Sequence, residues 1–124
     1  KIMVVAVDDI EKSLEIVALV KEQNPRIRII ARAIDRTHAR RLLASGVEHV
    51  IRDTFASSLE AATRTLEQLG YPEGRALEVT EMFRNHDETM LQNSVEHLDD
   101  IDKLQKLARE GRQELQELFE KDSR

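Results

Sequence analysis

Residues 1–9 read KIMVVAVDD, a continuous apolar run that ends in two aspartates. A run of this kind is typical of a strand that is buried on both faces of a parallel sheet. Asp8 and Glu11 have the spacing of a capping box, which predicts that a helix begins directly after the strand. This segment therefore predicts a strand followed at once by a helix, the repeating unit of an α/β fold.

The alternation of strands and helices continues as far as Gly70. The first helix ends at Asn24-Pro25, because proline disfavours the helical conformation in the residue before it. We expect strands over residues 27–33 and 47–52, a helix over 37–44 with Thr37 as its N-cap, and a helix capped by Thr54. This order predicts a parallel sheet with right-handed helical crossovers.

The composition excludes several classes of protein. The chain has 124 residues, of which 3% are aromatic, so we expect a small core of aliphatic side chains. No apolar run approaches the roughly 20 residues that a bilayer span needs. The absence of cysteine excludes disulfides, a thiolate nucleophile and a cysteine-based zinc site, and the four histidines have no metal-ligand spacing.

Charge is distributed unevenly along the chain. Residues 1–70 carry 11 basic and 10 acidic side chains, whereas residues 71–124 carry 8 and 14. Six arginines within sixteen residues present rigid forks that suit carboxylates and phosphates: Arg26, Arg28, Arg32, Arg36, Arg40 and Arg41. The formal net charge of −5 and the scarcity of aromatic residues argue against nucleic acid as a partner.

The sequence after Pro72 has the pattern of helices without strands. Its apolar residues recur at helical spacing in two series, Val79, Phe83, His86 and Met90, then Val95, Leu98, Ile101, Leu104, Ala108, Leu115 and Leu118. We expect two helices with a bend near Asn93-Ser94, the second weakened by Gly111. Their apolar stripe packs either on the same domain or against a second copy or partner chain. The expected domains are residues 1–70 and a helical extension, residues 71–124.

Candidate binding residues lie at or just after the carboxyl ends of the predicted strands, because ligands of open parallel sheets bind at that edge. These residues are Val7, Asp8, Asp9, Arg32, Ala33, Arg52 and Asp53. An arginine at such a position binds a phosphate or carboxylate through two parallel hydrogen bonds, or forms a salt bridge to a neighbouring acid. The aspartates are either helix caps or ligands, and the sequence leaves both pairs of alternatives open.

A glycine-rich phosphate loop is missing, since glycines at positions 46, 70, 74 and 111 cannot form one. The sequence begins at Lys1 without a methionine and runs straight into a strand. We therefore expect the phosphate-binding first half of a nucleotide-binding fold to lie outside this chain. The fold class predicted is α/β: the second half of a Rossmann-like doubly wound parallel sheet, followed by C-terminal helices.

Several motifs together resemble one family. They are Val4-Val5-Ala6-Val7-Asp8-Asp9, Ile29-Ile30-Ala31-Arg32-Ala33, Gly46-Val47-Glu48, Arg52-Asp53-Thr54-Phe55, Met82-Phe83-Arg84-Asn85-His86-Asp87 and Arg112-Gln113-Glu114-Leu115-Gln116-Glu117-Leu118-Phe119. In this order they are similar to the cytoplasmic regulatory domain (RCK, KTN or TrkA-N) of KefB/KefC-type glutathione-gated potassium efflux systems. The resemblance covers nearly the whole chain.

The resemblance implies a regulatory domain of a bacterial inner-membrane potassium–proton antiporter, on the cytoplasmic face and in the same polypeptide as the membrane domain. Members form dimers, bind AMP or NAD(H) in the Rossmann crevice, and often bind an ancillary flavin-dependent quinone oxidoreductase. Reduced glutathione holds the transporter closed, and bulky glutathione adducts open it.

The resemblance also assigns roles to individual residues. Arg52 matches an arginine that contacts glutathione, and Asp87 falls on a second polar contact where some relatives carry an amide. Asp8 and Arg32 occupy positions that line the nucleotide crevice. The ribose-binding acid of the family has no counterpart in this sequence.

Two other interpretations remain open at this stage. A phosphoacceptor receiver domain also opens with an apolar strand that ends in paired acids, and Asp53 would then be the acceptor; however, no strand-end lysine follows it. A purely structural dimerisation module would use the helices after Pro72. Because the sequence contains neither a nucleophile–base pair nor a metal constellation, we predict that the chain is not an enzyme.

Overall fold

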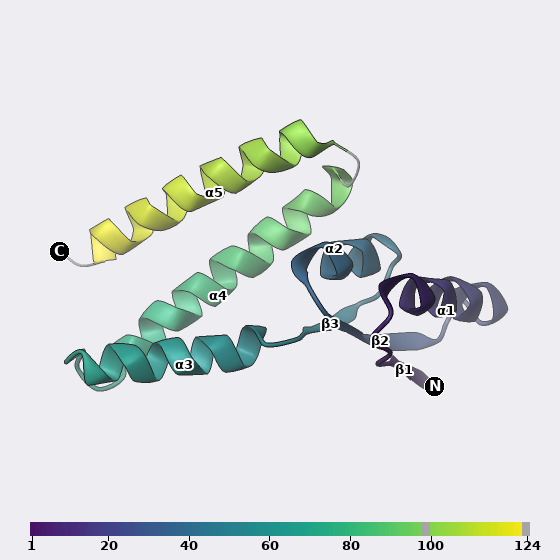
Figure 1. Ribbon diagram of the computed structural model, residues 1–124, viewed down its shortest axis with the longest axis horizontal. Coiled ribbons are helices and arrows are strands. Elements are labelled where there is room, and N and C mark those ends of the chain that lie inside the picture. The colour runs from purple at the N-terminus through teal and green to yellow at the C-terminus, as the bar shows by residue number, and fades with distance from the viewer. Residues whose placement is uncertain (98–99, 123–124) are drawn as a thin grey trace. The chain divides into compact units, whose positions relative to one another are not determined.

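The structure is a computed structural model that describes residues 1–97 and 100–122. The chain divides into two compact units, Lys1–Asp53 (unit 1) and Thr54–Arg124 (unit 2), and each is described by itself. Figure 1 shows a small sheet with helices in unit 1 and long helices in unit 2. Within the described residues, no helix has the length and apolar character needed to span a membrane.

Unit 1 is a parallel sheet whose strands are joined by helices. Its elements are β1 (Ile2–Val5), α1 (Ile10–Gln23), β2 (Arg28–Ala33), α2 (Arg36–Ala44) and β3 (His49–Arg52). The strand order is β1-β2-β3, and both pairs of neighbours are parallel. This arrangement confirms the predicted alternation and brings the carboxyl ends of all three strands to one edge.

One face of the sheet is buried and the other is open. On the first face Val5, Ile29 and Ala31 are at most 3% exposed, because α1 and α2 pack against the strands there. On the second face the alternate residues Ile2 and Val4 are 63% and 64% exposed. The expectation that the first strand is buried on both faces is therefore wrong within the described residues, since right-handed crossovers between successive neighbours place both helices on the same side.

The two helices of unit 1 begin with aspartates other than the predicted caps. Asp9, not Asp8, is the N-cap of α1, and its side chain accepts a hydrogen bond from the backbone N–H of Lys12 at 2.9 Å. Asp35, not Thr37, caps α2 by accepting from the backbone N–H of His38 at 2.7 Å. In both cases an extended aspartate that precedes the first helical residue can reach an unpaired N–H three residues later.

Unit 2 contains α3 (Phe55–Gln68), α4 (Arg75–Ser94), the short 3₁₀ helix η1 (Val95–His97) and α5 (Ile101–Asp122). The structure groups α3 with the helices that follow it, whereas the sequence pattern groups it with the sheet. Thr54 precedes α3 as predicted, but it has a left-handed backbone with φ 62° and forms no side-chain cap. The end of α4 at Ser94 coincides with the predicted bend. Leu98 of the predicted stripe lies outside the described residues.

The last helix packs closely against α4 at its glycine. Gly111 is buried, and a Cβ atom built there would lie 1.5 Å from Sδ of Met90. Glycine is unfavourable inside a helix, but its missing side chain leaves the space that Met90 of α4 occupies. The sequence pattern placed Met90 on an apolar stripe but did not identify this partner.

Candidate ligand-binding site

Arg32 lies at the edge of the sheet where all three strands end, and it contacts acids from both neighbouring strand ends. One of its terminal nitrogens forms a close ion pair with Asp8, which follows β1. Its Nε atom lies 3.2 Å from Oδ2 of Asp53, which follows β3. The salt-bridge alternative for Arg32 is therefore realised here, with two acids. We call Asp8, Arg32 and Asp53 the strand-end cluster.

The strand-end cluster has exposed groups and one poorly satisfied contact. Asp8 is 90% exposed, whereas the side chains of Arg32 and Asp53 are 33% and 37% exposed. The Nε atom of Arg32 is buried and forms no hydrogen bond within the described part of the chain. Its contact with Asp53 is thus an ion pair without hydrogen-bond alignment. A guanidinium in this state can turn toward a better-aligned phosphate or carboxylate.

The other predicted crevice residues differ in what they can contact. Val7 lies in the loop between β1 and α1 and is 38% exposed. The carboxylate of Asp9 is engaged as the cap of α1. Ala33 is fully buried, and its carbonyl accepts the backbone N–H of Asp53 at 2.9 Å. The structure therefore brings Asp8 and Arg32 together. Ala33 does not offer a side chain to a ligand, and its backbone carbonyl holds Asp53 at the edge of the sheet.

The two residues predicted to bind glutathione belong to different units. Arg52 is the last residue of β3 in unit 1, paired in register with Ala33, and is half-buried. Asp87 lies on α4 in unit 2, one helical turn after Phe83, and is also half-buried. Arg52 directly precedes Asp53 of the strand-end cluster in the sequence.

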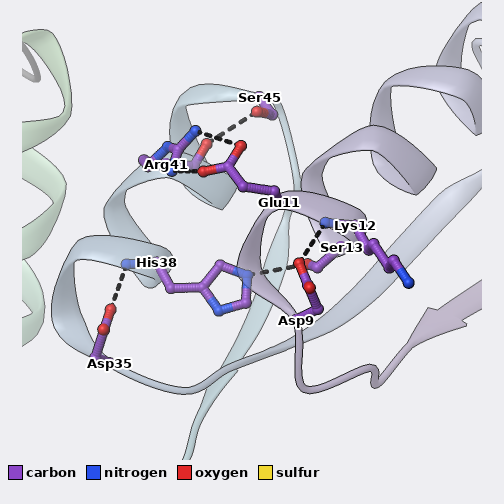
Figure 2. Close-up of polar contacts among 8 residues, drawn as sticks. All are labelled: Asp9, Glu11, Lys12, Ser13, Asp35, His38, Arg41 and Ser45. Atoms are coloured by element: carbon purple, nitrogen blue, oxygen red, sulfur yellow. Dashed lines mark hydrogen bonds and ion pairs between the residues drawn. The ribbon is translucent and has the colours of Figure 1, made fainter.

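A buried histidine holds the loop that follows β2. His38 of α2 is fully buried, and its Nδ1 atom accepts the backbone N–H of Ile34 at 3.1 Å. Nδ1 therefore carries no proton, and Nε2 donates to the hydroxyl of buried Ser13 on α1 at 2.9 Å, as Figure 2 shows. Burial lowers the pKa of His38, and Arg41 adds to this effect, while Asp35 and Asp53 oppose it. The ring is a neutral link between α1 and the loop beside the cluster.

An exposed ion pair joins the same two helices. The guanidinium of Arg41 on α2 donates to both carboxylate oxygens of Glu11 on α1, at 2.7 and 3.3 Å (Figure 2). This hydrogen bond lowers the pKa of Glu11 below its ordinary value. One member of the arginine-rich segment is therefore engaged in packing unit 1.

Unit 2 contains an open apolar groove. It has a volume of about 1410 Å³ and is lined by residues of α3, α4, α5 and the α3–α4 loop. All four aromatic residues of the chain line it: Phe55, Tyr71, Phe83 and Phe119. Arg75 and Asp122 also line the groove, and Arg75 forms ion pairs with Asp122 and with Glu78.

The sequence matches two families over complementary segments. Residues 57–124 match the potassium efflux system KefB C-terminal domain, and residues 1–53 match the TrkA-N domain. The first match covers more than half of the chain. The chain belongs to the KefB C-terminal domain family. The division between the two matches agrees with the division between unit 1 and unit 2.

Curated relatives in this family are glutathione-regulated potassium-efflux system proteins KefC. The protein from Klebsiella pneumoniae is 39% identical over 77% of this chain, and one from Escherichia coli is 36% identical over 74%. This chain spans 15% of the length of each of these two relatives. The comparison therefore concerns a short segment of each relative. It favours the interpretation of this chain as a Kef domain over its interpretation as a receiver domain with Asp53 as phosphoacceptor.

A solved structure of the Kef family has the same fold. It is the Kef C-terminal domain of Shewanella denitrificans in its AMP-bound form, with a TM-score of 0.73 and 36% sequence identity. The similarity covers 76% of this chain and 60% of that chain. It confirms the predicted Rossmann-like α/β class.

Sequence reasoning about this Kef domain missed two features. Asp53 was placed among the strand-end candidates and considered as a phosphoacceptor, but it was not identified as a partner of Arg32, although its place after a strand, like that of Asp8, was a signal for this contact. The gathering of the aromatic residues in one groove had no signal in the sequence, because it depends on how α3, α4 and α5 pack.

Proposed function

We propose that this chain is the ligand-sensing regulatory domain of a bacterial glutathione-gated potassium–proton antiporter. In this function, nucleotide and glutathione binding control potassium efflux. The observation that carries the proposal is the strand-end cluster, in which Arg32 lies at the carboxyl end of β2 between acids that follow β1 and β3, in a Kef-family domain. The names of the KefC relatives and the AMP-bound Kef structure support the two ligand classes.

The nucleotide, AMP or NAD(H), binds at the edge of the sheet in this proposal. Arg32 contacts its phosphate, and the exposed carboxylate of Asp8 accepts hydrogen bonds from its hydroxyl groups. Val7, Asp9 and Ala33 shape the wall of the crevice. Parallel sheets bind nucleotides at this edge, which is the physical reason for the assignment.

Glutathione is a tripeptide with two carboxylates and one ammonium group. Arg52 supplies a planar fork for a carboxylate, and Asp87 supplies a negative charge for the ammonium group. Both side chains are half-buried, so a contact there is less screened than on the open surface. The departure from the amide that some relatives carry at position 87 predicts a contribution from charge rather than from a neutral hydrogen bond.

The wider context belongs to the same proposal. The domain lies on the cytoplasmic face of the inner membrane, in one polypeptide with the antiporter domain, and forms a homodimer. Residues 71–124 are the helical extension for glutathione binding and dimerisation, and residues 1–70 are the nucleotide-binding part. A flavin-dependent quinone oxidoreductase is a further partner, and bulky glutathione adducts open the transporter.

Isothermal titration calorimetry of the complete polypeptide with reduced glutathione and with AMP tests the proposal. We expect both ligands to bind the native protein. Arg52→Ala should weaken glutathione binding at least about ten-fold, the effect of losing one charge-assisted contact. The matched control is Arg28→Ala, because Arg28 is exposed at the opposite, amino end of β2.

Three results would count against the proposal. If neither ligand binds, the regulatory function is wrong. If glutathione binds equally to the native protein and to Arg52→Ala, the assignment of Arg52 is wrong. An equal loss in Arg28→Ala would show that the effect arises from net charge and not from this site.

A further inference from the structure

Two acids contact Arg32, but the fold holds them differently. Asp53 follows β3, and its backbone N–H donates to the carbonyl of Ala33 at 2.9 Å, which extends the pairing of β2 with β3 by one residue. Asp8 lies in the loop between β1 and α1, and its side chain is almost fully exposed, whereas that of Asp53 is partly buried. The sheet therefore holds Asp53, while the carboxylate of Asp8 extends into solvent.

The register of the strands places Asp53 and Arg32 on the same face of the sheet. Arg32 pairs in register with Ile51 of β3, and successive side chains of a strand point to opposite faces. Asp53 comes two residues after Ile51, so it shares the face of Arg32, and Arg52 belongs to the other face. The distance of 3.2 Å between Nε of Arg32 and Oδ2 of Asp53 agrees with this placement.

The two acids contact different parts of the guanidinium of Arg32. Asp53 lies beside Nε, next to the aliphatic stem, whereas Asp8 lies beside the terminal nitrogen Nη2. A phosphate that is bound by both terminal nitrogens accepts two parallel hydrogen bonds. Such a phosphate competes with Asp8 for Nη2 but leaves the contact between Asp53 and Nε in place.

We propose that Asp53 is a positioning residue for the nucleotide phosphate: it holds Arg32 at the strand end, while the phosphate displaces Asp8 from the terminal nitrogens. An ion pair without hydrogen-bond alignment suits this role, because the guanidinium can turn while charge attraction keeps it beside Asp53. The displaced carboxylate of Asp8 then accepts a hydrogen bond from a hydroxyl group of the ligand. This inference rests on the proposed function, because it assumes that a nucleotide binds at Arg32.

The proposal predicts opposite effects for the two acids. Each of them places a negative charge near the phosphate, so charge alone would make the loss of either acid tighten the binding of an anion. Loss of Asp8 also removes the group that competes for Nη2. Loss of Asp53 instead releases the guanidinium toward Asp8, and the phosphate contact is weakened. The sign of the change at Asp53 therefore distinguishes positioning from a simple effect of charge.

Isothermal titration calorimetry of the complete polypeptide with AMP measures these effects. We expect Asp53→Asn to raise the Kd for AMP about five-fold, the upper end of what a partly exposed ion pair contributes. Asp8→Asn should lower the Kd about two-fold, because its pair is more exposed and the asparagine oxygen still accepts a hydrogen bond. Asp53→Glu retains the carboxylate and should restore most of the affinity.

Two controls separate positioning from net charge and from structural damage. Glu48→Gln removes an exposed acid that precedes β3, at the opposite end of the strand from Asp53, and should leave the Kd for AMP nearly unchanged. In an Arg32→Ala background, Asp53→Asn should not raise the Kd further, because the residue that it positions is absent. Structural damage would weaken AMP binding in both backgrounds.

The outcomes separate this inference from the proposed function. If the native protein does not bind AMP, the proposed nucleotide site fails. If it binds AMP and Asp53→Asn leaves the Kd unchanged or lowers it, the positioning role is wrong while the function stands. The role is also overturned if the loss persists in the Arg32→Ala background, is not restored by Asp53→Glu, or appears equally in Glu48→Gln. An equal loss in Asp8→Asn would show that the phosphate does not displace Asp8.

Discussion

His38 in unit 1 and His86 in unit 2 are both withdrawn from solvent, but their surroundings differ. Both ring nitrogens of His38 have hydrogen-bond partners at 2.9 and 3.1 Å, on α1 and in the loop after β2. The Nε2 atom of His86 has no hydrogen bond among the described residues, and Glu114 on α5 is 3.5 Å away. His38 therefore joins two elements of unit 1 through directed polar contacts, whereas His86 makes no such link between α4 and α5 among the described residues.

The apolar residues differ in the same way. In unit 1 the buried side chains of β2 and α2, such as Ile29 and Leu42, close a continuous core. In unit 2 the aromatic residues line an open groove, and large apolar side chains such as Leu69 and Leu118 remain exposed. The difference teaches that the helices of unit 1 close the core on one face of the sheet, while the packing of α3, α4 and α5 leaves the aromatic residues of unit 2 in an open groove. Exposed apolar side chains occur in both units, as Ile2 and Val4 on the open face of the sheet show.

The largest expected effect contrasts the two cores. Leu42→Ala removes a fully buried side chain of α2 and should cost about 2–5 kcal/mol of unfolding free energy, from lost burial and the cavity that remains. Leu118→Ala, at a site that is 40% exposed on α5, should cost about 1 kcal/mol or less. Urea denaturation followed by circular dichroism measures both. Equal losses would remove the proposed contrast between the units.

The second prediction tests the close packing of α4 on α5. Gly111→Ala should destabilise the protein by about 1–3 kcal/mol, because the new methyl group would occupy the position of the Met90 side chain. If the space beside Gly111 were empty, the same substitution would instead stabilise the protein, since alanine favours a helix over glycine by about 1 kcal/mol. The control is Gly111→Ala combined with Met90→Ala. In a double-mutant cycle, thermal or urea unfolding should show that the second change offsets the cost of the first.

The third prediction concerns pH and His38. Burial holds the pKa of His38 below that of the unfolded chain, which is about 6.5. The unfolded state therefore binds a proton that the folded state does not, so stability is fully present above that value and falls as the pH decreases below it. The loss begins as the pH falls through the unfolded-state pKa and continues until the folded-state pKa is reached. His38→Gln should lower stability at pH 7.5, because the Ile34 N–H loses its acceptor, and should reduce the pH dependence measured by urea unfolding.

The smallest expected effect is at the exposed ion pair of unit 1. Glu11→Gln removes the charge that Arg41 engages and should lower stability slightly, because exposed pairs are screened and entropically costly. The lowered pKa of Glu11 means that its contribution is present at neutral pH and is lost as the pH falls through the acidic range. The difference between native protein and variant should shrink in high salt. A salt-independent difference would point to packing rather than charge.

Much of unit 1 could be predicted from the sequence because its signals are local. The apolar runs over residues 1–7 and 27–33 and the proline at position 25 placed strands and a helix end correctly, with small differences in their bounds. The cap positions were wrong by one residue at Asp8 and by two at Thr37, because neighbouring residues offer equivalent side-chain oxygens. Which oxygen is used depends on the backbone angle at which the chain enters the helix.

The sequence by itself determined the alternation of strands and helices, the sheet edge at which Asp8 and Arg32 meet, and the resemblance to Kef regulatory domains. These follow from periodicity and strand direction, which depend on residues close in the chain. Only the tertiary structure decided that Arg32 pairs with Asp53 as well as Asp8, that Met90 packs on Gly111, and that the aromatic residues share one groove. Those contacts join residues far apart in sequence, and their distances depend on how the elements pack.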